Sequence, residues 1–128
     1  MLPSLNFIIL CDKANLGPDG KIDILGVFDN ISAPSFPARH KEMFVLIEAS
    51  LDKGEYEEIL KIDYNGQEKE IVGSRVKKEE KGRHLFMHQI TEMVFLEPGD
   101  YLIKIYINDI LAGTRKFSLK KKINEKTS

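Results

Sequence analysis

The sequence predicts an all-β fold: one antiparallel β-sandwich of about eight strands with Greek-key, immunoglobulin-like connections. Three observations lead to this prediction. Short β-rich runs are separated by turn residues roughly every ten positions. No segment fits helical spacing better than strand alternation. The run Pro98-Gly99-Asp100-Tyr101 places a tyrosine just after a turn, where it can hydrogen-bond back across a Greek-key corner. A closed barrel would show the same alternation and remains an alternative.

Eight segments carry strand patterns, and each is bounded by turn chemistry. They are residues 5–12, 22–28, 42–51, 56–64, 68–76, 84–96, 101–107 and 112–119. Asn65-Gly66 is the strongest hairpin signal, since a type I′ turn needs positive φ at both positions. Residues 32–41 contain Pro34 and Pro37 and follow neither period. We expect them to form a crossover loop between sheets, with Phe36 at the edge of the core.

The first two strands are apolar on both faces. The link Gly17-Pro18-Asp19-Gly20 predicts a turn that pairs them antiparallel, and Gly26 permits a bulge or a close backbone approach. If one parity (Phe7, Ile9, Ile22, Ile24) faces the core, the other forms a second apolar surface. That candidate interface comprises Ile8, Leu10, Leu25 and Val27. The alternative is that the crossover loop or the C-terminal segment covers it.

The later strands differ in character. In 42–51 one parity is wholly apolar, from Met43 to Leu51. The segment 68–76 is rich in charge, which suits an edge strand. The polar stretch 89–92 predicts a bulge or break within 84–96. The domain is predicted to span residues 1–119, followed by a flexible basic tail over 120–128.

Length and composition restrict the possible functions. A chain of 128 residues forms a single domain that needs neither a disulfide nor a metal ion to fold. A net charge of −1 argues against binding to nucleic acid or to acidic membranes. The single cysteine, Cys11, excludes an internal disulfide and favours a reducing compartment. The apolar run at 5–11 is too short to span a bilayer and lacks signal-peptide features. We therefore expect a cytoplasmic protein.

Few residues carry candidate chemistry. The neighbouring carboxylate of Asp12 would raise the pKa of Cys11, the opposite of what a nucleophile needs, so Cys11 is expected to be a core residue without a catalytic role. His84 and His88 share a face but stand roughly 13 Å apart, so a metal would need His40 beside one of them. The aspartates around the first hairpin form a weak candidate metal site for calcium, although turn aspartates more often cap their own backbone. These are Asp12, Asp19, Asp23 and Asp29. No catalytic or cofactor-binding motif is present, so no cofactor and no enzymatic activity are expected.

The N-terminal runs FIILCDKA, DGKIDILGVFDNI and FPARH closely resemble the start of a prokaryotic family of unknown function. Its members look like small all-β domains with an F-x-x-L-C-D-x-A run, then D-G-K, G-[VI]-F-D and F-P-A. The matching residues are Phe7, Leu10, Cys11, Asp12, Ala14, Asp19, Gly20, Lys21, Gly26, Phe28, Asp29, Phe36, Pro37, Ala38 and the P-G-x-Y run at 98–101. The resemblance supports the fold and implies no catalytic residue.

The leading functional hypothesis is a non-catalytic module that works by contact with itself or with another protein. It depends on the missing catalytic motifs and the two-sided apolar strands. The rival is a domain that binds a small ligand or a metal, conceivably with hydrolytic activity, through the carboxylates of the 12–29 hairpin and His40.

Overall fold

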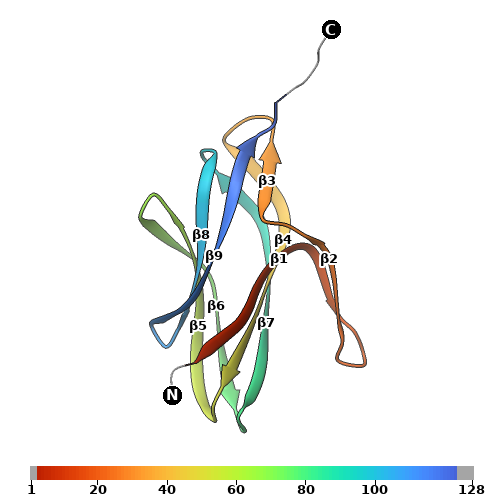
Figure 1. The fold of residues 1–128 in the computed structure, drawn as a ribbon, viewed down its shortest axis with the longest axis vertical. Helices are drawn as coiled ribbons and strands as arrows, with labels where there is room; N and C mark the ends of the chain where they lie inside the picture. Colours follow the sequence, from red (N-terminus) through yellow and green to blue (C-terminus); the bar gives the residue numbers. More distant parts are fainter. Residues whose placement is uncertain (1–2, 124–128) are drawn as a thin grey trace.

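A computed structural model describes residues 3–123, which form nine strands and no helix. The strands are β1 (Ser4–Leu16), β2 (Ile22–Val27), β3 (Asn30–Ala33), β4 (Ala38–Leu51), β5 (Gly54–Tyr64), β6 (Gln67–Lys78), β7 (Gly82–Phe95), β8 (Gly99–Ile107) and β9 (Ile110–Lys121). They build a four-stranded sheet in the order β2-β1-β4-β7 and a five-stranded sheet in the order β3-β9-β8-β5-β6 (Figure 1). The all-β prediction is confirmed.

The two sheets share one hydrophobic core. The four-stranded sheet contributes one whole face of β4, from Met43 to Leu51, together with Phe86 of β7. The five-stranded sheet contributes Leu60 of β5 and the alternating residues Tyr101, Ile103, Ile105 and Ile107 of β8. Side chains two residues apart on a strand share a face, which explains why these alternating runs meet in one core.

Turn residues begin the hairpins where the sequence predicts them. Asn65 and Gly66 have φ values of 53° and 81°, as a type I′ turn requires, and they join β5 to β6. Asn108 and Asp109 also have positive φ and join β8 to β9. Tyr101 Oη donates a hydrogen bond to the carbonyl oxygen of Glu97 at 2.6 Å, which confirms the predicted tyrosine contact across this turn.

One strand was missed, and it is not antiparallel. β3 lies within and just before the predicted crossover segment and pairs in parallel with β9. The chain therefore leaves the four-stranded sheet after β2, adds β3 to the other sheet, and returns as β4. Phe36, in the link to β4, packs against the core edge as expected. Pairing with β9 explains β3, because four residues with little periodicity carry no strand signal of their own.

The predicted start of the C-terminal tail is too early. β9 continues to Lys121, and the amide of Lys122 donates to the carbonyl oxygen of Ala33 at 2.7 Å. Pairing with β3 therefore holds the first lysines of the predicted tail in the sheet. Residues 124–128 of that tail lie outside the described residues.

The break predicted in the long strand β7 occurs at Glu92, where the strand changes which alternate side chains face the core. We call this change the reversal at Glu92. This residue has a φ of 57°, while the register with β4 stays constant on both sides. Phe86 and Ile90 face the core before it, and Met93 and Phe95 face the core after it. The residues that turn inward therefore change parity within one strand.

Candidate functional sites

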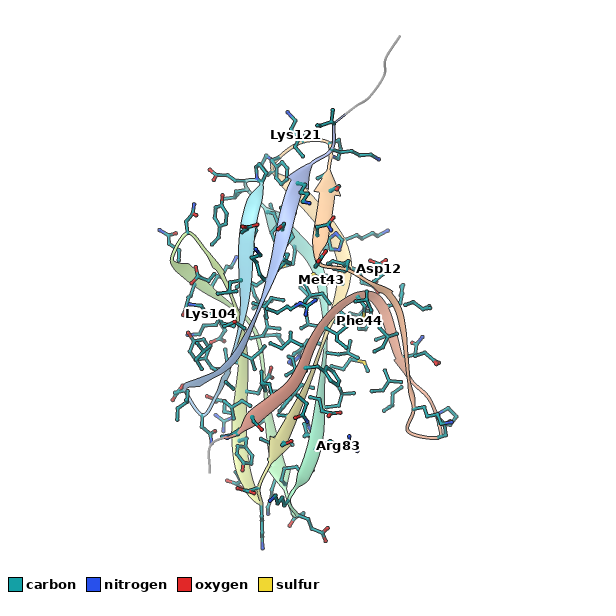
Figure 2. The ribbon with its side chains drawn as sticks, in the orientation of Figure 1. Asp12, Met43, Phe44, Arg83, Lys104 and Lys121 are labelled. Carbon is teal, nitrogen blue, oxygen red and sulfur yellow. The ribbon has the colours of Figure 1, made fainter. Side chains whose placement is uncertain are left out.

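The first candidate surface lies on the hairpin of β1 and β2, which projects from the body of the two sheets (Figure 1). Its turn is held by backbone hydrogen bonds from Gly17 to Lys21 and from Gly20 to Gly17. At the bend, Gly26 has a φ of 69°, and the side chain of Asp12 fills the space that a Cβ would occupy there. The sequence predicts a bulge or a close backbone approach at Gly26, and the close neighbour found there is the side chain of Asp12. Asp12 marks this bend in Figure 2.

Two of the four residues of the interface predicted from the first two strands do not lie at the surface. Ile8 and Leu10 are buried in the main core, because they pair with Ile47 and Val45 on the inward face of β4. Leu25 and Val27, in contrast, are 62% and 61% exposed. Both parities of β1 are apolar, so its own sequence could not decide which one faces inward. The pairing with β4 decides it.

The opposite parity of β1 packs on the outer face of the four-stranded sheet. We call this group the outer cluster: Phe7, Ile9, Cys11, Ala14, Ile22, Ile24, Phe44, Leu46, Leu85 and Met87. The hairpin residues Ile22 and Ile24 belong to it, so the hairpin covers part of that face. Cys11 is buried here, as predicted. The pKa of its thiol is raised mainly by burial and to a smaller extent by the negative charge of Asp12.

Three large apolar side chains of the hairpin remain uncovered. Leu16 is 65% exposed, similar to Leu25 and Val27. Leu16 pairs with Ile22 and therefore lies on the face of Ile22 and Ile24, not on that of Leu25. We call Leu25 and Val27 the hairpin patch. β2 is also the edge strand of its sheet, so its outer backbone edge has no partner strand within residues 3–123.

The four candidate metal ligands are not brought together. Asp19 accepts a hydrogen bond from the amide of Lys21 at 3.0 Å, and Asp29 accepts one from the side chain of Asn30 at 2.9 Å. Asp12 packs on Gly26, and Asp23 lies exposed on β2. Across residues 3–123, no three histidine, cysteine, aspartate or glutamate side chains are arranged to hold a metal ion. His40 packs edge-on against Phe28 with ring centroids 6.0 Å apart.

Sequence reasoning missed a buried polar pair in the core. Nε2 of His88 on β7 lies 2.9 Å and 3.0 Å from the two carboxylate oxygens of Glu58 on β5, and Glu58 is fully buried. Ser74 Oγ of β6 donates to the same carboxylate at 2.9 Å. The alternation of β5 could have indicated this, since Glu58 shares its parity with Leu60 and Ile62. The pair connects the two sheets across the core.

Charged groups cover the outer face of the five-stranded sheet. Lys104 Nζ lies 2.8 Å from carboxylate oxygens of both Asp63 and Glu68 (Figure 2 labels Lys104). These hydrogen bonds raise the pKa of Lys104, and the bonds from Lys104 and Tyr106 lower the pKa of Glu68. Lys104 and the two carboxylates neutralise one another, so these groups form ion pairs on the surface rather than a site for an ion.

The fold and these surfaces define an all-β, two-sheet domain with a projecting apolar hairpin. The chain belongs to a family of unknown function (DUF6941), whose model matches residues 6–120. No curated protein matches the sequence. Among solved structures, the chain is similar to part of the alkylpurine DNA glycosylase AlkC of Pseudomonas fluorescens, bound to DNA containing an abasic site analogue.

That structural similarity has a TM-score of 0.53 at 11% sequence identity. It covers 92% of this chain but only 30% of the glycosylase chain. At this identity the likeness concerns the fold alone. Within residues 3–123 there is also no helix of the length and apolarity needed to cross a membrane.

Proposed function

We propose that this protein is a non-catalytic binding module that contacts a protein surface through the hairpin patch. The partner is a second copy of the chain or another protein. The observation that carries the proposal is the position of Leu25 and Val27, two largely exposed apolar side chains on one projecting hairpin. Apolar side chains exposed together on one short strand commonly mark an interface, whereas single exposed apolar residues need no explanation.

The geometry of the hairpin supports this use. Its inner side is already anchored through Ile22 and Ile24 in the outer cluster, so the hairpin patch is presented on a supported element. The free edge of β2 adds backbone donors and acceptors next to the apolar side chains. A partner could therefore bury the patch and extend the sheet at the same time.

Self-association can be tested by sedimentation velocity over a wide range of protein concentrations. We expect the wild-type chain to shift toward a dimer as concentration rises, and the double variant Leu25→Asp/Val27→Asp to stay monomeric. The matched control is Ile110→Asp/Leu111→Asp, which changes two exposed apolar residues at the start of β9 and should behave as wild type.

Contact with another protein needs a second measurement if the wild type stays monomeric at every concentration. A photo-crosslinking amino acid at position 25 should then capture one defined partner in cells, while the same group at position 110 should not. A monomeric chain that crosslinks to nothing in particular at position 25 would refute the proposal.

We also propose that the two sheets form an immunoglobulin-like Greek-key sandwich. The shared core and the hydrogen bond from Tyr101 to Glu97 support this finer description. A cytoplasmic location is proposed as well, supported by the single cysteine, Cys11, whose thiol is buried and unpaired.

A further inference from the structure

The side of the molecule between β6 and β7 is closed along only part of its length. These strands are edge strands of different sheets, so no ladder joins them. At one end Lys78 Nζ donates to the carbonyl oxygen of Arg83 at 3.3 Å. In the middle, Ser74, Glu58 and His88 bridge the sheets. Beyond this bridge, toward the start of β6 and the end of β7, lies an open groove of about 410 Å³.

The groove has an apolar wall. Its apolar wall comprises Ile62, Tyr64, Ile71, Met93, Phe95 and Tyr101, and Glu68 and Lys69 of β6 also line the groove. The two tyrosine rings stack with centroids 4.3 Å apart, and both hydroxyls donate to the 97–98 segment. Tyr101 is buried, with Tyr64 and Phe117 both stacked against its ring, so the partly exposed ring of Tyr64 is the aromatic surface that an occupant can reach. The reversal at Glu92 turns Met93 and Phe95 toward this side.

One cation stands at the rim of the groove. Lys69 pairs in register with Ile62, whose side chain is in the core, so Lys69 lies on the inward face of the sheet edge. Its neighbour Glu68 points to the other face, where it binds Lys104 and Tyr106. The ion pairs of this region join Glu68 and Asp63 to Lys61 and Lys104, and Lys69 belongs to none of them.

The edge of β6 is poorly suited to receive a partner strand. An inward-pointing charge and a bulge both discourage edge pairing, and β6 has both, with a register shift opposite Leu60 and Lys61. The volume of the groove, in contrast, lies within the range of small-molecule sites. An apolar wall with one cation at its rim is complementary to a small amphipathic anion.

We propose that this groove binds an apolar carboxylate, either a hydrocarbon chain or an aromatic acid. The apolar body lies against Ile71, Met93 and Phe95, and the carboxylate accepts a hydrogen bond from Lys69. This site is separate from the hairpin patch and from the carboxylates of the first hairpin. Its existence does not depend on the proposed protein contact.

The test is a titration of the full chain with decanoate, decanol and decylammonium, followed by amide chemical shifts. Decanoate is expected to bind most tightly and to shift the amides of Lys69, Ile71 and Met93. Lys69→Gln should weaken decanoate binding about tenfold, since a charge-assisted hydrogen bond is lost, while decanol binding should change little. Lys116→Gln, which removes an exposed lysine on β9, is the matched control.

A second variant tests the apolar wall without disturbing the core. Leu96 is 70% exposed at the mouth of the groove, so Leu96→Ser should fold normally and weaken decanoate and decanol alike. The proposal is overturned if decanoate fails to bind at millimolar concentration, if decylammonium binds equally well, or if Lys69→Gln and Lys116→Gln have the same effect. Co-sedimentation with phosphatidylglycerol vesicles without binding of free decanoate would also overturn it, since the ligand would then be a membrane surface.

Discussion

At the scale of single residues, the pair formed by Glu58 and His88 departs most from an ordinary β-domain core. A fully buried carboxylate is tolerated only when its oxygens are bonded, and here His88 and Ser74 supply those bonds. We expect His88→Ala to lower the free energy of unfolding by about 3–5 kcal/mol, because Glu58 would remain buried without its main partner. Urea denaturation at pH 7 measures this.

Replacement of both Glu58 and His88 distinguishes the effect of an unpaired buried charge from the effect of lost packing. In Glu58→Leu/His88→Leu no charge is left unpaired, so its stability should return to within about 2 kcal/mol of wild type. If the double variant loses as much as His88→Ala, the effect is one of packing and the pairing account is wrong.

A second residue-scale prediction concerns His84. The pKa of His84 is lowered below 6.5 mainly by burial and to a smaller extent by the positive charge of Lys78. The negative charge of Glu58 acts in the opposite direction. The unfolded chain therefore takes up this proton at a higher pH than the folded chain. The stability from neutral His84 is present above pH 6.5 and is lost as the pH falls through the lowered pKa.

Two measurements check the His84 prediction. Lys78→Gln should raise the pKa of His84 in an NMR titration, whereas Lys77→Gln, on the same strand but paired with Glu79, should change it less. His84→Gln should lose less stability than wild type between pH 7 and pH 5. An unchanged pKa in Lys78→Gln would contradict the assignment of Lys78 as a cause.

The residues of the pair show what the sequence could and could not predict at this scale. Tyr101 and Cys11 behave as predicted, since a turn before a tyrosine and a cysteine in an apolar strand are local signals. The sequence does show that Glu58 and His88 each alternate with apolar residues that face the core. It does not show their contact, because that depends on how β5 and β7 of different sheets face one another.

At the scale of elements, the bend of the first hairpin depends on one glycine. A Cβ on Gly26 would lie 2.8 Å from Cγ of Asp12 and closer still to its Oδ2, at a positive φ. Gly20, in the turn of the same hairpin, also has positive φ but open space around it. We expect Gly20→Ala to cost roughly 1–2 kcal/mol from backbone strain alone and Gly26→Ala to cost clearly more.

A double variant identifies the cause of the Gly26 effect. Asp12→Ala removes Cγ and both oxygens and leaves only its Cβ, 3.1 Å from the added methyl group. In the Asp12→Ala background, Gly26→Ala should therefore cost about as much as Gly20→Ala. Thermal unfolding, with amide exchange of the β1–β2 hairpin, gives both values. An equal cost for Gly26→Ala with and without Asp12 would argue against the steric account.

The sequence predicts which segments form strands where the local pattern is strong, but it does not always predict which face of a strand points into the core. β4 shows one wholly apolar parity, and this is the parity that faces the core. β1 is apolar on both parities, and only its register with β4 places Ile8 and Leu10 inside. β3 escaped detection because its strand character comes from a partner far along the chain, β9.

At the scale of the whole molecule, the two long sides between the sheets differ. Between β6 and β7 the sheets are bridged by polar groups and leave a groove. Between β1 and β9 the sheets meet by direct packing, where Leu5 lies against Gly113. A smaller pocket of about 230 Å³ borders Leu5 and Gly113 on this second side, so among the described residues the groove between β6 and β7 is the larger of the two openings.

The direct packing of β1 against β9 can be tested through Gly113. An added Cβ there would lie 2.5 Å from Cδ1 of Leu5, and the backbone of Gly113 is not in the left-handed region, so the cost is steric. Overpacking of this kind typically costs about 1–3 kcal/mol, which we expect for Gly113→Ala in urea denaturation. Leu5→Ala makes room for the new methyl group, so the double variant should lose less than the sum of the two single changes. Additive losses would mean that Leu5 and Gly113 do not touch, and that β1 and β9 are held together by other residues.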